Sequence, residues 1–508
     1  MTGMASVTIG NLMSWVQGLS PASAAQLRHS LSYFVPNYER TQEFQRGGWD
    51  GKRYLLFPDT NHCWRFPTGL LYRVLNWLSA KKIPYMVVRD LPGTEPMQRM
   101  QYLLGRRAMG YRLYPYQADA VASIITKHVG RMGGVLRMAT GSGKTVVASK
   151  ILQLQRVPTI ILVNTKDLLY QWKQDLETTF SCGIGQVGDG AYDIRDVTVA
   201  TVQSVGRALG VTMHNTTRER PLAVDTSDFA EWLIRCVQLA IVDEAHQVAA
   251  ESVYECVFKL ANVLSVIGLS ASPWRDDGLD ILIEAACGPI VYTITASDLI
   301  DMLNPLTGSP YLVPPVITAY EIAEPDRLTP AHTDTGVPHE FHKAWIVDHV
   351  ARNKFIAQLA QQDMIDGRIV LILVKRLEHG KILTDMIPGS RFVEGKNTSK
   401  TRKKAYDDVR DGTLRCLVAT TLADQGLDLP AVSSLILAGG GRSSTKALQR
   451  IGRVIRSAPG KTDARVHDLI DAHRNFKQHY LARERIYKTE RRFTITRVRV
   501  NREKMLSE

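Results

Sequence analysis

Two short segments of this chain combine glycine, lysine, hydroxyl and carboxylate side chains at close spacing. The first is a glycine-rich turn with the sequence MATGSGKT at residues 138–145, and the second is an apolar run that ends in DEAH at residues 243–246. Curled glycine backbone turns its N–H groups toward phosphates, lysine adds a positive charge, and a threonine hydroxyl can bind Mg²⁺. Together the two segments predict a site that hydrolyses ATP with Mg²⁺.

The expected roles of these residues follow from phosphoryl transfer, which depends mostly on positioning and charge neutralisation. We expect Thr145 to bind Mg²⁺, Asp243 to hold the same ion through water, and Glu244 to orient or deprotonate the attacking water. Lys144, Asp243 and Glu244 are therefore predicted catalytic residues. Met138 replaces the glycine that opens the full form of the loop, but the functional end of the loop is intact. The loop residues predicted to contact ATP are Thr140, Gly141, Ser142, Gly143, Lys144 and Thr145.

The elements around these segments alternate between strand-like and helical patterns from about residue 110 to 300. This alternation is typical of an α/β domain with a parallel sheet, in which ligands bind outside the carboxyl ends of the strands. A second α/β pattern follows it and has no second phosphate loop. The strand-like runs are 135–138, 159–163, 197–201, 239–242 and 263–269 in the first pattern, and 369–374, 416–419, 434–437 and 464–467 in the second.

Composition limits the class of protein and its partners. Lys and Arg number 63 against 50 Asp and Glu, a formal charge of +13 that favours a polyanionic partner. The six cysteines are scattered without metal-ligand spacing, which favours a reducing compartment over a zinc site or a disulfide framework. The sequence shows no secretory signal pattern and no apolar stretch of membrane-spanning length. We therefore expect a soluble cytoplasmic protein with no membrane partner.

Further segments resemble the ordered motifs of the superfamily 2 helicases, and the resemblance covers nearly all of residues 112–470. YPYQ at 114–117 resembles the Q motif, in which a glutamine reads the adenine edge; a capped helix start is the alternative interpretation. Trp172 in motif Ia is expected in the core rather than as a base-stacking platform. The other matches are 163–165 with 171–172 for motif Ia, 200–204 for motif Ib, 269–273 for motif III, 418–430 for motif V and 449–456 for motif VI.

The resemblance implies roles for individual residues of this chain. Gln117, Gly426 and Asp428 would contact ATP, and Ser270 and Ser272 would couple the ATP site to movement. Gln449, Arg453 and Arg456 would complete catalysis, with the two arginines three residues apart on one helix face converging on the γ-phosphate; a solvated basic helix is the alternative. The residues that would hold a nucleic-acid strand are Thr165, Thr201, Gln203, Thr420 and Thr421.

The resemblance also implies an α/β fold class with two tandem RecA-like domains that have parallel sheets, preceded by a small α+β accessory domain. Tryptophans at 15, 49, 64 and 77 mark the accessory domain, and seven of the 22 prolines lie between 301 and 340. The predicted boundaries are 1–108 for the accessory domain, 109–304 and 341–480 for the RecA-like domains, 305–340 for an inter-domain connection and 481–508 for a basic C-terminal extension.

Within the superfamily the chain is most similar to the UvsW helicases of T-even phages and more distantly to RecG and XPB. The segments that carry this similarity are GWDGK at 48–52, FPTGLL at 66–71, EHGK at 378–381 and VHDLID at 466–471. The resemblance implies an ATP-dependent DNA helicase or translocase that acts on forks, Holliday junctions or R-loops, in the cytoplasm of a bacterial host if a phage encodes it. Its partners would be single-stranded and branched DNA and RNA–DNA hybrids, with a monomer favoured and the oligomeric state left open.

Other functions stay open at this point. They are a translocase subunit of a restriction or defence system, an RNA helicase, and an ATP-gated clamp or annealing factor that does not unwind. Residues 483–504 hold nine basic and three acidic side chains. They are interpreted either as an added phosphate contact or as an edge strand protected by charge. The first interpretation predicts that deletion of residues 483–508 weakens DNA binding and flattens its dependence on salt.

Overall fold

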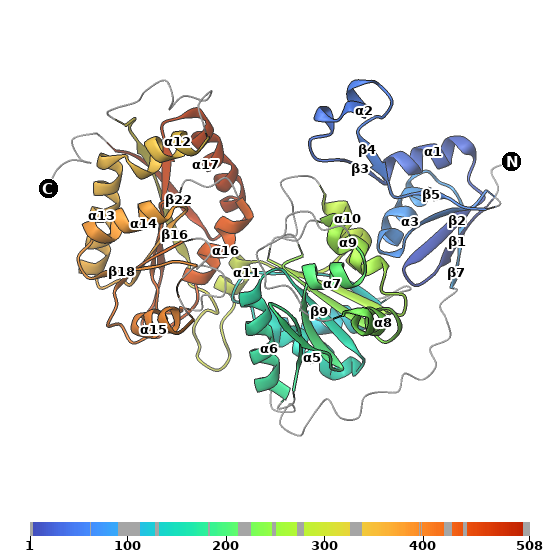
Figure 1. The fold of residues 1–508 in the computed structure, drawn as a ribbon, viewed down its shortest axis with the longest axis horizontal. Helices are drawn as coiled ribbons and strands as arrows, with labels where there is room; N and C mark the ends of the chain where they lie inside the picture. Colours follow the sequence, from blue (N-terminus) through green and yellow to red (C-terminus); the bar gives the residue numbers. More distant parts are fainter. Residues whose placement is uncertain are drawn as a thin grey trace. The chain divides into compact units, whose positions relative to one another are not determined.

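The computed structural model places the chain in two compact units (Figure 1). The first comprises Met1–Met138 and Gly143–Ile294, and the second comprises Ala139–Ser142 and Thr295–Glu508. Among the described residues, no helix is both long and apolar enough to cross a membrane. The structure describes residues 4–60, 62–89, 112–126, 132–180, 183–211, 225–245, 250–271, 279–325, 338–395, 397, 399–420, 429–439 and 444–500.

The phosphate-loop half of the chain is built on an eight-stranded sheet with the strand order β11-β10-β12-β9-β13-β14-β8-β15. Every neighbouring pair is parallel except β10 with β11. All residues of the central strands β9, β12, β13 and β14 are buried, which explains their continuous apolar sequences. The strands are β8 (Met132–Met138), β9 (Thr159–Val163), β10 (Gly185–Gly188), β11 (Ala191–Asp193), β12 (Val197–Thr201), β13 (Leu239–Asp243), β14 (Ser265–Ser270) and β15 (Ile290–Ile294).

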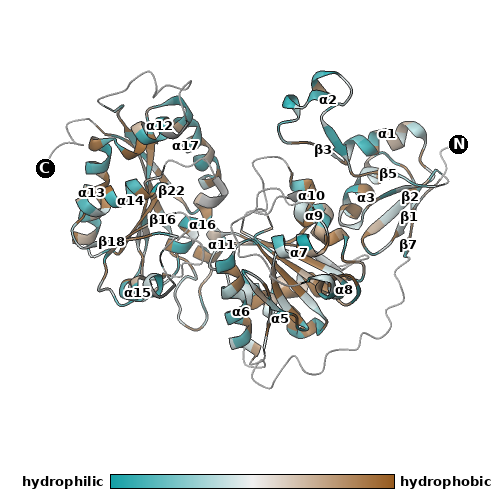
Figure 2. Cartoon of the chain, in the orientation of Figure 1, coloured by the Kyte–Doolittle hydropathy of each residue, from teal (hydrophilic) through white to brown (hydrophobic). Residues whose placement is uncertain are grey.

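Helices cover this sheet and turn their polar faces outward, as the mixed colours of the helices and the brown strands show in Figure 2. The helices of this half are α4 (Pro115–Thr126), α5 (Lys144–Gln155), α6 (Lys166–Phe180), α7 (Val202–Ala208), α8 (Ser227–Arg235), α9 (Ala250–Phe258) and α10 (Asp280–Cys287).

The second sheet has seven strands, all parallel, in the order β18-β19-β17-β20-β21-β16-β22. Its strands are β16 (Pro315–Ile322), β17 (Val370–Val374), β18 (Ser390–Val393), β19 (Cys416–Thr420), β20 (Ser434–Leu437), β21 (Ala464–Asp471) and β22 (Thr494–Arg499). The helices of this unit are α11 (Ala296–Asp301), α12 (Pro338–His342), the π-helix η5 (Lys343–Val347), α13 (Val350–Ile365), α14 (Leu377–Met386), α15 (Ser399–Arg410), α16 (Ser444–Val454) and α17 (Arg474–Tyr487). The two parallel sheets confirm the predicted fold class.

A smaller mixed sheet with the strand order β5-β6-β2-β1-β7 forms the N-terminal part. β1 pairs in parallel with β7, whereas the other pairs are antiparallel. A two-stranded sheet, β3 with β4, lies apart from it. The elements are β1 (Ala5–Ile9), β2 (Met13–Gln17), α1 (Pro21–Ser30), β3 (Ser32–Phe34), η1 (Tyr38–Arg40), α2 (Gln42–Gln45), β4 (Lys52–Tyr54), β5 (Phe57–Pro58), β6 (Trp64–Pro67), η2 (Thr68–Leu70), α3 (Leu71–Ala80) and β7 (Tyr85–Arg89). This arrangement is the predicted α+β accessory part.

Two stretches predicted to lie outside the RecA-like domains contribute strands to the second sheet. The proline-rich connection 305–340 contains β16, which lies between β21 and β22. Proline is tolerated there because Pro315 is the first residue of the strand. The extension 481–508 contains the end of α17 and the edge strand β22. The remaining domain boundaries stay predictions.

The basic residues near the C-terminus are largely used for packing within the second unit. Arg483 is buried, and its Nη2 lies 2.7 Å from Asp468 Oδ1. Arg497 pairs with Glu484 at 2.7 Å, and Arg491 pairs with Asp301. Deletion of residues 483–508 would therefore remove an edge strand and uncover a buried aspartate, so it cannot report on DNA contact alone. The charged edge strand is the interpretation that this geometry favours.

The accessory part packs closely on α10 through a glycine. A Cβ atom on Gly69 would lie 2.1 Å from the carbonyl oxygen of Glu284 and 2.5 Å from that of Ala285. Beside this contact, Arg73 Nε donates to Glu284 Oε2 at 2.6 Å. Burial raises the pKa of the Glu284 carboxyl, and the charge of Arg73 opposes that rise. Buried apolar residues of the accessory part and of α10 belong to one cluster.

We predict that Gly69→Ala destabilises the protein by about 1–3 kcal/mol, because the added methyl group has no space against backbone atoms. Urea denaturation checks this change in the free energy of unfolding. Gly48→Ala is the matched control, since its Cβ would meet its nearest atom at an ordinary 3.6 Å. Equal stability of the two variants would show that α10 and the accessory part do not pack as described.

Candidate nucleotide-binding site

The phosphate loop joins the end of β8 to the start of α5. Gly141 and Gly143 have positive φ values of 87° and 79°, a region that side-chain-bearing residues rarely adopt. A Cβ on Gly143 would also lie 2.5 Å from Gln117 Nε2. α5 begins at Lys144, so the unpaired N–H groups of its first turn lie next to the loop. This is the backbone arrangement that binds anions at helix N-termini.

Asp243 is held in place at the carboxyl end of β13. Its side chain is buried, its Oδ1 accepts a hydrogen bond from the Glu244 N–H at 2.9 Å, and its Oδ2 accepts one from Trp172 Nε1–H at 2.7 Å. Burial, followed by the negative charge of Glu244, raises the pKa of Asp243 to about 6. The charge of Lys144 and the bond from Trp172 oppose this rise. The carboxylate therefore ionises near neutral pH and has a fixed orientation.

Glu244 and Lys144 meet beside this aspartate. Lys144 Nζ lies 3.3 Å from Glu244 Oε1, with both side chains mostly buried. Glu244 has a φ of 47°, a left-handed conformation that costs a non-glycine residue on the order of 1–3 kcal/mol. Such strain persists only where the surrounding structure enforces it, and it is concentrated at functional sites. Here it turns the Glu244 side chain out of the strand direction, next to the lysine of the loop.

These residues fit ATP with Mg²⁺. Carboxylate and hydroxyl oxygens are the hard donors that Mg²⁺ prefers, and Asp243 and Thr145 supply them. Lys144 and the N-terminus of α5 supply positive charge for the phosphates. When bound, Mg²⁺ neutralises charge on the phosphates of ATP. If ATP and Mg²⁺ bind here, Lys144 would contact phosphate oxygen, Asp243 would hold the ion, and Glu244 would be the carboxylate that can orient a water molecule or accept its proton.

Gln117 lies against the phosphate loop and also forms a hydrogen bond at the start of its own helix. Its side chain is 4% exposed, and its Oε1 accepts a hydrogen bond from the Tyr114 N–H at 3.1 Å, at the start of α4. This is the capped helix start that the sequence left as an alternative. The amide still faces Gly143 of the loop, and its role in reading adenine stays a prediction.

Of the residues predicted to hold nucleic acid, those that the structure describes lie at the ends of parallel strands or near the starts of helices. Thr165 Oγ1 accepts a hydrogen bond from the Leu168 N–H at 3.4 Å, and Thr201 Oγ1 accepts one from the Ser204 N–H at 3.2 Å. Thr201 is fully buried, so a strand could be held there by backbone N–H groups but not by its hydroxyl. Gln203 is also buried, and contact of these residues with nucleic acid stays a prediction.

Thr420 differs from these threonines because its hydroxyl has no hydrogen-bond partner among the described residues, although it is buried at the end of β19. An unpaired buried hydroxyl costs about 1–3 kcal/mol, so this position favours a ligand that supplies the missing partner. Ser270, the predicted coupling residue, is fully buried at the end of β14. Four predicted site residues lie outside the described residues: Ser272, Thr421, Gly426 and Asp428.

The predicted arginine pair departs from its expected geometry. Gln449 and Arg453 lie on α16, but the helix ends at Val454 and Arg456 lies beyond it, in an isolated bridge with Leu312. The interpretation of one helix face for both arginines is therefore wrong. The cause is a backbone hydrogen bond, from the Val313 N–H to the Ile455 carbonyl at 2.8 Å, which takes the chain out of the helix.

The turn after α16 is held by a half-buried lysine. Lys461 Nζ donates to the carbonyl oxygens of Pro430 at 2.9 Å, Val432 at 2.5 Å and Val454 at 2.5 Å. Burial lowers the pKa of Lys461 to about 7. Its three hydrogen bonds join the end of α16 to the loop that precedes β20.

Trp172 is the functional residue whose role the sequence did not reveal. Its predicted core position is confirmed, with 3% of the side chain exposed, but its bond to Asp243 was not expected. The available signal was the indole N–H itself, because a buried tryptophan N–H usually needs a hydrogen-bond partner. Its partner, Asp243, lies 71 residues away at the end of β13, so a local sequence pattern does not specify this contact.

Two family models match this chain. Residues 110–275 match the model described as "Type III restriction enzyme, res subunit", and residues 353–458 match the model described as "Helicase conserved C-terminal domain". The first match includes the loop and Asp243–Glu244, and the second includes β17, β19, β20 and α16.

Individual relatives extend these matches. The DNA 3'-5' translocase XPB2 of Sulfurisphaera tokodaii is 26% identical over 68% of this chain and 78% of its own length. The ATP-dependent DNA helicase uvsW of Enterobacteria phage T4 is 24% identical over 88% of this chain and 86% of its own length. This chain covers only 51% to 65% of the length of several other relatives.

Solved structures show the fold. A fragment of a putative HsdR subunit of a type I restriction enzyme from Vibrio vulnificus YJ016 matches with a TM-score of 0.52 at 17% identity, covering 78% of this chain and 71% of that chain.

We predict that Trp172→Phe moves the acid limit of nucleotide binding to higher pH. The bond from Trp172 stabilises the charged form of Asp243, so its loss raises a pKa that already lies at about 6. The ionised carboxylate is then lost earlier as the pH falls. Titration of Mg²⁺-dependent binding of a fluorescent ATP analogue between pH 5 and 8 measures this shift.

The control for this experiment is Trp232→Phe, which changes a partly buried tryptophan whose N–H has no hydrogen-bond partner among the described residues. The control should keep the wild-type pH profile. If Trp172→Phe keeps it too, the bond to Asp243 does not tune the site.

Proposed function

Because this chain belongs to the superfamily 2 helicases and is UvsW-like, we propose that it is an ATP-dependent DNA helicase or translocase acting on branched DNA. Its substrates are forks, Holliday junctions or R-loops, which it unwinds or branch-migrates. The observation that carries the proposal is the carboxyl end of β13, where a buried Asp243 and a strained Glu244 lie beside Lys144 of a glycine-rich loop. A second parallel sheet carries Thr420, one of the proposed nucleic-acid contacts, at the end of β19.

ATP hydrolysis in this proposal depends on charge supplied at fixed positions. Lys144 binds the phosphates, Asp243 holds Mg²⁺, Glu244 orients the attacking water, and Arg453 and Arg456 neutralise the transferred phosphoryl group. Separating DNA costs about 1–2 kcal/mol per base-pair step, which one ATP can supply.

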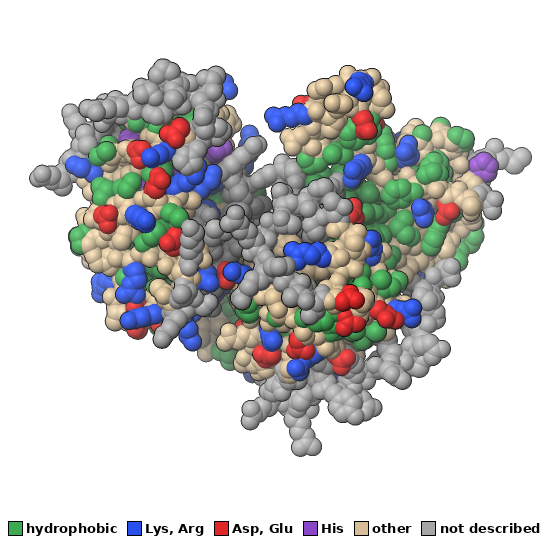
Figure 3. Space-filling model, in the orientation of Figure 1, with side chains coloured by type: hydrophobic (Ala, Val, Ile, Leu, Met, Phe, Trp, Pro, Cys, Tyr) green, Lys and Arg blue, Asp and Glu red, His purple; other side chains and the backbone are tan. Residues whose placement is uncertain are grey.

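Nucleic-acid contact is supported by the unpaired hydroxyl of Thr420 and by the net charge of +13. The charge does not by itself locate a binding surface. On the face drawn in Figure 3, basic and acidic side chains of the described residues are interspersed. We propose that the same nucleic-acid strand is also contacted by backbone N–H groups near the starts of two helices, next to Thr165, Thr201 and Gln203.

A translocase subunit of a restriction system is the second candidate. The observation that favours it is the match of residues 110–275 to the restriction-enzyme model. Such a subunit would move along duplex DNA without separating the strands and would need a nuclease partner. A strand-displacement assay on a fork, a four-way junction and an RNA–DNA hybrid, with ATPase stimulation measured on each, distinguishes the two functions. Stimulated ATPase activity without displacement favours the translocase or a clamp.

We predict that Lys144→Ala and Glu244→Gln each reduce ATP hydrolysis by at least about 10³-fold while the protein stays folded. Lys144→Ala also weakens ATP binding, whereas Glu244→Gln keeps it because the phosphate contacts remain. Steady-state ATPase assays and equilibrium nucleotide binding measure the two effects. Lys150→Ala is the control, because Lys150 lies on the same helix and contacts Gln153 instead of the loop. Normal hydrolysis by Glu244→Gln would contradict its role.

We also expect Arg456→Ala to bind ATP with nearly wild-type affinity but to lose hydrolysis, because a guanidinium that acts on the transition state contributes little to ground-state binding. Single-turnover hydrolysis with a pre-bound nucleotide measures this separation. Normal single-turnover hydrolysis by Arg456→Ala would refute the assignment.

A further inference from the structure

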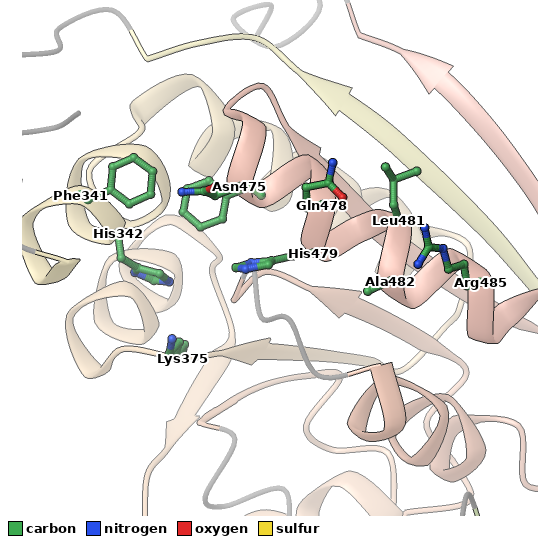
Figure 4. A pocket seen from close by; sticks show the side chains of 10 residues that line it. Phe341, His342, Lys375, Asn475, Gln478, His479, Leu481, Ala482 and Arg485 are labelled. Carbon is green, nitrogen blue, oxygen red and sulfur yellow. The ribbon is translucent and has the colours of Figure 1, made fainter. Parts of the chain in front are cut away.

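The second unit contains a pocket of about 600 Å³ at the carboxyl ends of its strands (Figure 4). Lys375 directly follows β17, and α17 begins three residues after the end of β21. Ligands of open parallel sheets bind at this edge, and the volume is in the range of small-molecule sites. Of the nucleic-acid contacts proposed above, none lines this pocket.

A buried ion pair joins two strand ends at the same edge of the sheet. Arg352 is fully buried, and its Nε lies 2.6 Å from Asp471 Oδ1 at the end of β21. Its Nη2 also donates to the carbonyl oxygen of Ala438, just beyond β20, at 3.0 Å. Because one guanidinium joins two strand ends, the elements around the pocket are held without a ligand.

His342 gives the pocket an unused hydrogen-bond acceptor. The residue is 7% exposed, and its Nε2 lies 3.3 Å from the carbonyl oxygen of Gly439. A carbonyl can only accept, so Nε2 carries the proton. Burial lowers the pKa of His342 to about 4, which leaves the ring neutral and Nδ1 with a free lone pair. Nδ1 has no hydrogen-bond partner in the described part of the chain. A ligand that donates a hydrogen bond would satisfy it.

The lining also includes two cations and two phenylalanines, beside the uncharged residues Asn475, Gln478, Leu481 and Ala482. Lys375 and Arg485 are exposed, neither forms an ion pair in the described part of the chain, and no acidic residue lines the pocket. Phe341 and Phe476 stack with ring centroids 5.3 Å apart and an angle of 11° between their planes. Figure 4 shows Phe341, His342 and Lys375 at one end and Arg485 farther along α17.

We infer that this pocket binds one nucleotide of a nucleic-acid strand, an inference that rests on the proposed function. The cations Lys375 and Arg485 contact its phosphates, the phenylalanine pair packs against its base, and an N–H or O–H group of the nucleotide donates to His342. A free inorganic anion lacks the planar surface and the donor, and an apolar ligand lacks the charge. A nucleotide has all three features.

The phosphate contacts are tested with Lys375→Ala/Arg485→Ala and a fluorescein-labelled single-stranded 20-mer DNA. We expect the dissociation constant at 0.1 M salt to rise about 10-fold and the slope of log K against log salt to fall by about 1.4, for two lost contacts. The matched control is Arg474→Ala/Lys477→Ala, which removes two exposed charges from the same helix but not from the pocket. Equal losses in the two double variants would overturn the inference.

The base contact is tested with an abasic 20-mer of the same charge. Wild-type protein should bind the base-bearing strand at least about 5-fold more tightly, because stacking on aromatic rings is lost without bases. Phe341→Leu should reduce this preference and leave the salt slope unchanged. If wild-type protein binds both strands equally, the pocket does not take a nucleotide.

The same measurements separate this inference from the proposed function. Wild-type protein that neither binds the 20-mer nor hydrolyses ATP faster in its presence would refute both. Wild-type protein that binds it and is stimulated, while pocket and control variants behave alike, refutes the pocket alone. Basal ATPase activity without DNA should be unchanged in Lys375→Ala/Arg485→Ala, which shows that the variant is folded.

Discussion

Parallel pairing of strands is the constraint on which the candidate site depends. In a parallel sheet every carboxyl end lies on one edge, so β8, β13 and β14 place the glycine loop, Asp243 and Ser270 together although they come from distant parts of the chain. The central strands are mostly apolar because both faces are buried, and they carry no charged residue before the strand end. The same constraint acts in the second sheet, where Thr420 ends β19 and Lys375 follows β17. Chemistry is thereby restricted to one edge of each sheet.

The sequence was sufficient where the signal is local. Continuous apolar runs predicted β9, β12, β13 and β17, and the glycine loop predicted the turn into α5, because these features depend on burial and backbone freedom within a few residues. The strand β16 was missed since its prolines and turn residues resemble a connection, and only pairing with β21 and β22 reveals it. The assignment of a role in ATP binding to Lys144 and Asp243 could be made from residue types alone, and it stays a prediction.

The parts of the site that the sequence could not predict depend on distant contacts. Trp172 reaches Asp243 across 71 residues, so helical periodicity identifies it only as a core residue. Arg456 was expected on the helix with Arg453, but a backbone bond from Val313 to Ile455 ends the helix first. Gly69 belongs to a segment that the sequence analysis noted only for its family similarity, whereas the reason for glycine is the backbone of α10, more than 200 residues away. In each case the contacting residue comes from a distant part of the chain, and only the tertiary fold brings it into place.

The three hydrogen bonds of Lys461 have a mechanical consequence. One ammonium group holds the last carbonyl of α16 and two carbonyls of the segment 430–432, so neither can shift far without breaking one of these hydrogen bonds. The helix that carries Gln449 and Arg453 is thereby linked to the chain that leads into β20 through polar contacts rather than through the apolar core. All three bonds require the ammonium form of Lys461, because a neutral amine has only two N–H donors for three carbonyls.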